Sequence, residues 1–305
     1  MRVSFNAPRD FNFWRTVYSH GWCSLPPFEV KKESGTLSQV IELSNGRAVR
    51  VEIFPQSKNR IAVQIQSENS ISPKSRNEIV AQVRSCLRLE EDYSEFYREA
   101  NQQVRFRWVP RTGAGRLLRS PGVFEDVVKM ICTTNCSWAL TEIMVGNLCK
   151  KLGFKFPGSD PQNSGFTFPR PEVIADCSEK FLRKEIHAGY RAPYLLELSK
   201  RIVSNEINLE SWRHSDLPTE ELFLQVRAVK GVGPYAAGNI LKLLGRYDYL
   251  AIDSWCRKKF FELHKNGRKT SDNVIEKFYK PFGKWRGLFF WMDVTKHWYD
   301  KKFPF

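Results

Sequence analysis

The sequence predicts an α+β fold in which a small antiparallel β-sheet domain, residues 1–105, precedes a larger helical domain, residues 106–305. In the first part, apolar and polar residues alternate with a period of two, which is typical of half-buried strands. After about residue 105 the apolar period lengthens to roughly 3.6 residues, which is typical of helices. Strands and helices that are segregated along a chain in this way indicate an α+β architecture.

The clearest strand signal surrounds the dipeptide Asn45-Gly46. Apolar and polar residues alternate on both sides of it, from residue 36 to residue 54. Asn-Gly fits a type I′ hairpin turn because both central residues of that turn need a positive φ. Residues 60–66 are expected to add a third strand, and residues 72–89 a helix whose N-terminus is capped by Ser72 or Ser75.

Helical signals dominate the rest of the chain. Residues 120–153 begin with Ser-Pro, carry acidic residues in the first turn and end at a glycine, with a break expected near Thr134 and Asn135. A loop rich in Gly and Pro follows at residues 153–171, and helical patterns then continue to about residue 298. The second domain is therefore expected to be helical throughout.

The charge balance points to an anionic partner. Lys and Arg number 48 against 33 Asp and Glu, so the formal net charge is +15, and nucleic acid and acidic membrane surfaces both fit. No apolar run reaches the length of a membrane-spanning helix, and the first residues lack the apolar core of a signal peptide, so we expect a soluble intracellular protein. The seven cysteines contain no Cys-x-x-Cys, which argues against a disulfide framework and against a zinc site; we expect no metal and no cofactor.

A glycine turn joins two apolar stripes in residues 221–245. The spacing of the apolar residues predicts two helices, with the turn at Gly231-Val232-Gly233 between them and Pro234 in the first helical position. Backbone N–H groups at a helix N-terminus favour an anion, such as a DNA phosphate. The alternative is a plain helical hairpin whose glycines only make the corner.

A single aspartate, Asp253, follows an apolar run and precedes a basic helical segment. At a helix N-cap its side chain would accept backbone N–H bonds, and the helix dipole would favour its ionised form. Near a deoxyribose C1′, that charge would stabilise the oxocarbenium-like character that develops as an N-glycosidic bond breaks. An ordinary N-cap is the alternative, and the spacing alone does not decide between the two.

The hairpin and Asp253, taken with residues 115–139, 187–202 and 282–294, resemble the helix-hairpin-helix DNA glycosylase superfamily. The similarity is to the branch of 8-oxoguanine DNA glycosylase and 3-methyladenine DNA glycosylase II, which also has an N-terminal antiparallel sheet domain. It covers about residues 105–298 at the level of motifs, and the first hundred residues by architecture only. It implies a monomeric base excision repair enzyme that acts on double-stranded DNA with a damaged base, with no membrane partner.

The resemblance also implies roles for individual residues. Asp253 matches the catalytic aspartate, and four residues of the hairpin match the DNA-binding turn: Gly231, Val232, Gly233 and Tyr235. Asn135 matches an asparagine that fills the gap left by the flipped nucleotide, although it is also suited to cap a helix. Arg191 is expected near the DNA or, alternatively, as a structural tie, and Trp255 matches a phosphate-contacting histidine, or is a packed aromatic.

The same resemblance implies a pocket for the flipped base. We assign three residues to it: Asn239, Phe290 and Trp291. Aromatic residues near the C-terminus could stack on an electron-poor alkylated base, and they are Trp285, Phe289, Phe290 and Trp291. Their spacing is equally typical of a helix packed in a core.

Two departures from the family pattern bear on the reaction. Bifunctional members have a lysine two residues after the second hairpin glycine, where this chain has Tyr235, so we expect a monofunctional glycosylase without lyase activity. Lys230 and Lys242 are near in sequence, but neither occupies that position. The alternatives are an 8-oxoguanine-type enzyme with a lyase lysine elsewhere, or a catalytically silent DNA-binding protein. Only Cys256 follows Asp253, too few thiols for an iron–sulfur cluster.

Overall fold

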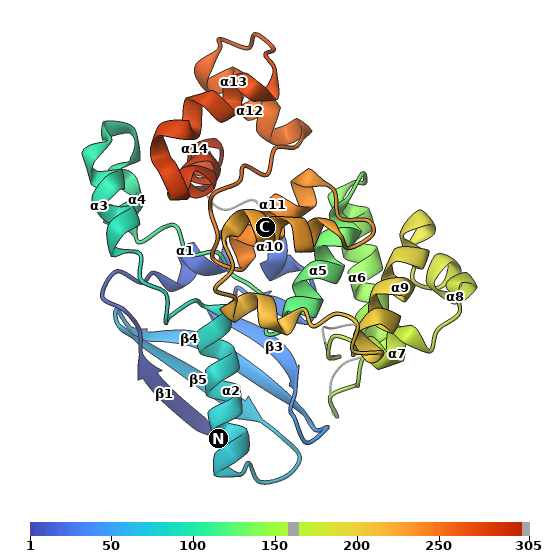
Figure 1. Cartoon of the computed structure of the whole chain (residues 1–305). Helices are drawn as coiled ribbons and strands as arrows, with labels where there is room; N and C mark the ends of the chain where they lie inside the picture. Colours follow the sequence, from blue (N-terminus) through green and yellow to red (C-terminus); the bar gives the residue numbers. More distant parts are fainter. Residues whose placement is uncertain (158–164, 301–305) are drawn as a thin grey trace.

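The computed structural model describes residues 1–157 and 165–300, and it has a five-stranded antiparallel sheet at its N-terminal end (Figure 1). The strand order is β1-β5-β4-β3-β2. The strands are β1 (Arg2–Asn6), β2 (Phe28–Lys31), β3 (Thr36–Glu42), β4 (Ala48–Ser57) and β5 (Arg60–Gln66). β3, β4 and β5 confirm the predicted hairpin and third strand. The turn itself is not type I′, because only Gly46 of the Asn-Gly pair has a positive φ, +78°. β1 and β2 were not predicted, because both are short and find their partners only through tertiary pairing.

Helices make up most of the remaining described chain. They are α1 (Phe13–Val17), α2 (Pro73–Cys86), α3 (Ser94–Gln102), α4 (Trp108–Thr112), α5 (Val123–Thr133), α6 (Trp138–Leu152), α7 (Pro171–Ala175), α8 (Glu179–Lys184), α9 (Ala192–Val203), α10 (Thr219–Arg227), α11 (Pro234–Leu243), α12 (Ser254–His264), α13 (Asp272–Tyr279) and α14 (Arg286–Asp300). The fold is therefore α+β, as the sequence predicts.

Local signals place several of these boundaries correctly. The Ser72 hydroxyl accepts a hydrogen bond from the Ser75 N–H at 3.1 Å and caps α2, which lies across one face of the sheet in Figure 1. The expected break between α5 and α6 is present, and Asn135 there has a φ of +48°, in the left-handed region that Asn tolerates better than most residues. Both features depend on one residue and its immediate neighbours.

The apolar core consists of two clusters. The first joins the sheet to α5, α10 and α11, and includes Val51 and Ile131. The second joins α3 and α4 to the last three helices and includes Phe96 and Phe289, whose rings are 5.0 Å apart. The first cluster contains residues on both sides of residue 105, so the sheet and the central helices are packed together. The domain boundary near residue 105 stays a prediction.

A buried arginine links the sheet side of the molecule to α11. Arg88, just after α2, is completely buried and donates to the carbonyl of Lys242 at 2.9 Å and to that of Leu243 at 2.8 Å. The last carbonyls of a helix lack intrahelical partners, so this guanidinium caps the C-terminus of α11. Arg119 donates to the same Leu243 carbonyl at 3.2 Å, and Glu91 pairs with both arginines, at 3.0 and 2.9 Å.

Replacing Arg88 should therefore destabilise the whole fold. We expect Arg88→Met to lower the free energy of unfolding by about 3–5 kcal/mol, because it removes the cap of α11 and leaves Glu91 with less compensation. Arg183→Met is the matched control, since Arg183 pairs with Glu179 on the exposed surface of α8 and should contribute less than about 1 kcal/mol. Urea denaturation of both variants measures the difference, and equal losses would contradict the role assigned to Arg88.

Candidate active site

The glycine turn between α10 and α11 has the geometry of a tight helical hairpin. Gly231 has a φ of +86°, and a Cβ added there would lie 2.7 Å from the ring of Tyr194 on α9, so both the backbone and the space require glycine. The Val232 N–H donates to the Val229 carbonyl at 3.1 Å, and its side chain is buried. Among the described residues, no acceptor takes the N–H groups of Gly231 or Gly233. Gly233 is the N-cap of α11.

Asp253 is the N-cap of α12, as the sequence predicts. Its Oδ1 accepts a hydrogen bond from the Cys256 N–H at 2.7 Å, and the carboxylate is partly buried. Gly238 of α11 brings the two segments together, because a Cβ added there would lie 3.3 Å from the Cα of Ala251. The chain leading to Asp253 therefore lies directly against α11. The Asp253 carboxylate caps α12 and lies next to α11.

One cavity of about 500 Å³ brings most of the predicted site residues together. Asp253 lines it, and α11 contributes Tyr235, Asn239 and Lys242 from a single face, since these positions are separated by four and three residues. Five tryptophans form much of the wall: Trp22, Trp138, Trp255, Trp291 and Trp298. A concave, mostly apolar cavity of this size with a few polar groups is typical of a small-ligand site and is large enough for a nucleobase.

Of the two aromatic residues assigned to the base pocket, one lines the cavity and the other lies in the core. Trp291 lines the cavity and donates from Nε1 to the Ser19 carbonyl at 3.1 Å. Phe290 does not line it; it is fully buried in the second core cluster, 5.2 Å from the ring of Tyr279, so its assignment to the base pocket is corrected. Consecutive helical residues point about 100° apart, and on α14 this turns Phe290 toward the core while Trp291 lines the cavity. Trp285 and Phe289 also pack in that core.

Two cavity tryptophans were not among the site residues that the sequence predicted. Trp22 donates from Nε1 to Asp126 Oδ1 at 2.8 Å, and Trp138 donates to Glu142 Oε1 at 2.9 Å. Gly21 fits under the Trp138 indole, since an added Cβ would lie 2.4 Å from it. No local pattern signals these rings as site residues, because the cavity that they line is formed by distant parts of the chain.

Trp255, at the start of α12, packs among the other aromatics. Its ring centre lies 5.2 Å from that of Trp298 and 6.4 Å from that of Trp291. The packed-aromatic alternative therefore describes its position, and contact between Trp255 and a phosphate stays a prediction.

Asn135 and Arg191 meet at the turn between α5 and α6. Asn135 is exposed on this turn, whereas Arg191 is only 3% exposed and donates to the carbonyl of the neighbouring Thr134. Arg191 also stacks on Tyr190, 4.4 Å from the ring centre, and the Tyr190 hydroxyl donates to the same carbonyl at 3.2 Å. Arg191 thus acts as the structural tie that the sequence left open, and it holds the turn that presents Asn135.

Lys242, which the sequence placed near the hairpin but outside the lyase position, lines the cavity. Its side chain is 3% exposed, and its Nζ lies 4.6 Å from the ring centre of Trp291. Among the described residues, none accepts a hydrogen bond from this amine. Burial lowers the pKa of Lys242 to about 8, although Cys256 and Asp253 oppose that shift. Lys242 is seven residues after Tyr235, a spacing that puts both side chains on the same face of a helix, and this spacing is the sequence feature that points to its position in the cavity.

A histidine beside this lysine is held in its neutral form. Burial lowers the pKa of His20 to about 3, and the nearby charge of Lys242 contributes to that shift. His20 Nε2 lies 2.6 Å from the Leu118 carbonyl, which can only accept a hydrogen bond, so Nε2 carries the proton. The other ring nitrogen, Nδ1, is therefore an acceptor, and the cavity is lined by both an amine donor and an imidazole acceptor.

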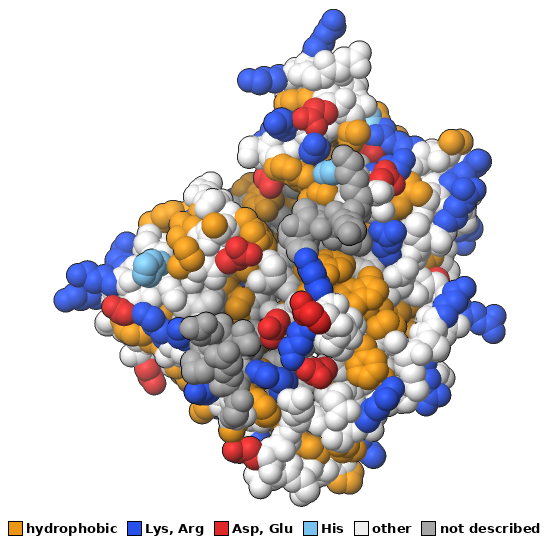
Figure 2. All heavy atoms as spheres, turned by 180° about the vertical axis from the view of Figure 1, so that it is seen from behind, with side chains coloured by type: hydrophobic (Ala, Val, Ile, Leu, Met, Phe, Trp, Pro, Cys, Tyr) orange, Lys and Arg blue, Asp and Glu red, His pale blue; other side chains and the backbone are white. Residues whose placement is uncertain are grey.

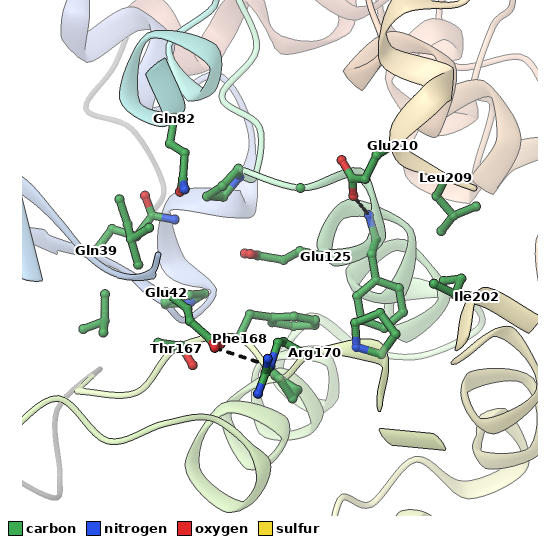
Figure 3. Close-up of a pocket in the computed structure, with 18 of the residues that line it drawn as sticks. Gln39, Glu42, Gln82, Glu125, Thr167, Phe168, Arg170, Ile202, Leu209 and Glu210 are labelled. Carbon is green, nitrogen blue, oxygen red and sulfur yellow. Dashed lines mark hydrogen bonds and ion pairs between the residues drawn. The ribbon is translucent and has the colours of Figure 1, made fainter. Parts of the chain in front are cut away.

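A second cavity, of about 630 Å³, lies between β3, the start of α5 and the end of α9 (Figure 3). Glu42 pairs there with Arg170 at 3.3 Å, and Glu210 accepts from the Val123 N–H at 3.0 Å. Although it is the larger of the two, none of the predicted site residues lines it. We therefore take the tryptophan-lined cavity as the candidate active site, because Asp253 and most of the other predicted site residues line it.

The surface carries the excess positive charge that the composition indicates. Lys and Arg side chains project from much of the outline of the face in Figure 2. No helix in the described part of the chain is both long enough and apolar enough to cross a membrane. Within residues 1–157 and 165–300, no three His, Cys, Asp or Glu side chains are grouped so as to hold a metal ion.

Comparison of sequences finds distant relatives. No protein-family model matches the chain. A Bacillus subtilis protein provisionally named a DNA-3-methyladenine glycosylase is 23% identical over 132 residues, which cover 42% of this chain and 45% of that protein. The N-glycosylase/DNA lyase of Saccharomyces cerevisiae is 25% identical over 145 residues, which cover 43% of this chain and 38% of that protein. The matched segments span less than half the length of either relative.

Comparison of structures finds similarity over nearly the whole chain. The 3-methyladenine DNA-glycosylase from Archaeoglobus fulgidus has a TM-score of 0.76 and 22% identity, and the match covers 98% of this chain and 99% of that one. The 8-oxoguanine glycosylase/lyase of Clostridium acetobutylicum has a TM-score of 0.73 and 20% identity, with 96% and 95% covered. Its complex with double-stranded DNA has a TM-score of 0.64 and 20% identity, with 91% and 99% covered. The chain has the fold of these DNA glycosylases, which confirms the fold that the resemblance implied.

The two hairpin glycines should respond differently to substitution. We expect Gly231→Ala to lower the free energy of unfolding by roughly 1–3 kcal/mol, because the residue has a positive φ and the new methyl group meets Tyr194. Gly233→Ala is the control; its φ is −80° and the added Cβ meets open space, so it should cost less than about 1 kcal/mol. Thermal and urea unfolding measure both, and a larger loss for Gly233→Ala would refute the assignment.

Lys242 should reduce stability at neutral pH. Its folded-state pKa of about 8 lies below the usual 10.5, so the protonated amine disfavours the folded state at pH 7, and this cost declines as pH rises through about 8. We expect Lys242→Met to raise the free energy of unfolding by about 1–3 kcal/mol at pH 7 and by much less near pH 10. Urea denaturation at both pH values tests this, and a gain that grows with pH would contradict it.

Proposed function

We propose that the protein is a DNA glycosylase that extrudes a damaged base from double-stranded DNA into the tryptophan-lined cavity and cleaves its N-glycosidic bond, leaving an abasic site. One observation carries the proposal. Asp253 lines a cavity of about 500 Å³. Helix α11, whose N-terminus is the glycine hairpin, forms one wall of the same cavity. A group that binds phosphate and a group that can assist bond cleavage are thus parts of one helical unit.

The grip on DNA would come from the hairpin and the surface charge. The N–H groups of Gly231 and Gly233 are available at the N-terminus of α11, where the helix dipole favours a phosphate. Asn135, exposed on its turn, is suited to occupy the space left by the extruded nucleotide. Extrusion costs a few kcal/mol of unstacking and pairing, and it costs least at a damaged base. The protein would act as a monomer, inside the cell, where DNA is present.

Asp253 would act on the sugar. As the glycosidic bond lengthens, positive charge develops on C1′ and the ring oxygen, and a nearby carboxylate stabilises it. The bond from the Cys256 N–H at 2.7 Å holds Asp253 in place, and hydrogen bonding of this kind favours the ionised carboxylate. Water then adds to C1′, and the base leaves with its electron pair and a proton.

Tyr235 supports a hydrolytic reaction without lyase activity. It lines the cavity at the position where bifunctional members of the superfamily have a lysine. Burial raises the pKa of Tyr235, and the charge of Asp253 raises it further, so the side chain remains a neutral phenol. A phenol cannot form a Schiff base with C1′. Lys242 in the same cavity favours one second candidate, a glycosylase whose lyase amine is Lys242.

The aromatic residues of the cavity give less support for an alkylated base than the sequence suggested. An alkylated base was expected because of four aromatic residues near the C-terminus, and only Trp291 of these lines the cavity. Tryptophans from other segments restore a stacking surface for a flat base. The buried amine of Lys242 also lines the cavity, and a positive charge there does not favour an electron-poor base.

The test of the proposed function is Asp253→Asn. We expect base release to fall by roughly 10²–10³-fold, because the carboxamide cannot offset the charge on C1′, while affinity for DNA stays within about threefold. Release is measured on duplexes with alkylated, oxidised and deaminated bases by alkaline cleavage of the abasic product. Asp176→Asn, on the exposed end of α7, is the control and should keep full activity.

Two results would decide against parts of this proposal. If the unaltered protein releases no base from any duplex but binds DNA, it is a catalytically silent binding protein. If borohydride traps a covalent adduct with DNA, a lysine acts as a nucleophile and the reaction is not purely hydrolytic.

A further inference from the structure

Lys242 lines the tryptophan-lined cavity, and its amine lies over the Trp291 ring, 4.6 Å from the ring centre. The Lys242 amine has three N–H donors and no acceptor among the described residues, and the side chain is 3% exposed. A largely buried donor without an acceptor costs free energy, and the contact with the Trp291 ring stabilises the charge without supplying that acceptor. Such a group in a cavity that fits a nucleobase indicates that a bound molecule supplies the missing acceptor.

The position of Lys242 along α11 places it opposite the base and not the sugar. Tyr235, in the first turn of α11, is close enough to Asp253 that this carboxylate raises the pKa of the phenol. Lys242 lies seven residues further along, which is about 10 Å at 1.5 Å per residue. If C1′ lies near Asp253, the base attached to it extends away from the helix N-terminus and toward Lys242.

His20 adds an acceptor next to this donor. Its Nε2 donates to the Leu118 carbonyl, so Nδ1 has a free lone pair, and the ring is near enough to Lys242 to sense its charge. Both residues line the cavity. An amine donor and an imidazole acceptor together match a base edge on which a carbonyl oxygen is next to a ring N–H.

We propose, on the basis of the proposed function, that Lys242 is a specificity-determining residue that donates to the carbonyl of a neutral base with a lactam edge, with His20 accepting from the adjacent ring N–H. The substrates are then oxidised or deaminated bases. Cationic N-alkylated purines are disfavoured, because they would bring a second positive charge beside a buried ammonium. The Lys242 amine also already occupies a face of Trp291, 4.6 Å from its ring centre, where a cationic base would otherwise gain cation–π stabilisation.

A hydrogen-bonding site of this kind should discriminate strongly. The bond from an ammonium to a carbonyl is charge-assisted, and a base without the acceptor leaves the buried donor unpaired. Sites built around such bonds reject analogues that lack the matching group far better than apolar pockets reject a change in size. Ethenoadenine lacks the carbonyl, whereas 7-methylguanine keeps the carbonyl and the ring N–H but carries a positive charge that the ammonium repels. We therefore expect the unaltered protein to release hypoxanthine or 8-oxoguanine at least about 10-fold faster than either of them.

The experiment compares single-turnover release from these four duplexes for the unaltered protein, Lys242→Met, Lys242→Gln and a control, Lys180→Met, whose lysine is exposed on α8. Both Lys242 variants should lose about 10-fold or more on neutral hypoxanthine and 8-oxoguanine, and should keep or gain rate on 7-methylguanine, because the repulsion between its positive charge and the ammonium is removed. The control should match the unaltered protein. Thermal unfolding of each variant verifies that it is folded.

Three outcomes would overturn the inference. One is a preference of the unaltered protein for 7-methylguanine, and another is an equal loss on all four duplexes in folded Lys242 variants. The third is a borohydride-trapped adduct that disappears in Lys242→Met, since the amine would then be a nucleophile. Failure of the proposed function is separate, because in that case no duplex loses a base and no variant can alter a preference.

Discussion

The buried contact between Arg88 and the last carbonyls of α11 is the constraint on which the rest of the structure depends. Arg88 leaves the end of α2, which packs on the sheet, and its guanidinium caps the helix that carries the site. The N-terminus of α11 is the glycine hairpin, and one face of this helix presents Tyr235, Asn239 and Lys242 to the cavity. The buried guanidinium of Arg88, together with that of Arg119 on the same Leu243 carbonyl, therefore anchors the end of the helix that carries the hairpin and Lys242.

Asp253 and Lys242 face one cavity from different elements, and each has a structural consequence. The carboxylate caps α12 through the Cys256 N–H, so the ordinary N-cap and a catalytic group are compatible descriptions of the same atoms. The amine has no hydrogen-bond acceptor among the described residues, and burial lowers its pKa to about 8 although Cys256 and Asp253 oppose that shift. A fold that retains this cost at the centre of a cavity is consistent with selection for binding at the expense of stability.

The cavity wall is assembled from segments far apart in the sequence. Trp22 comes from the segment before the sheet's second strand, Trp138 from the start of α6, and three further tryptophans from α12 and α14. Each ring near the N-terminal side has its own polar partner, such as Asp126 for Trp22 at 2.8 Å. The rings are thus fixed before any ligand enters, which reduces the entropy cost of binding a flat molecule between them.

The sequence by itself determined the α+β class, the strands β3 to β5, the Ser72 cap, the break at Asn135, the glycine hairpin and the N-cap position of Asp253. Each of these rests on signals within a few residues: a period, a turn dipeptide, or a cap. Only the tertiary structure decided that Phe290 belongs to the core, that Arg191 ties a turn, and that Trp22, Trp138, His20 and Lys242 line the same cavity as Asp253. Burial and long-range pairing have no local signature, because the partner that buries a side chain lies tens to hundreds of residues away in the chain.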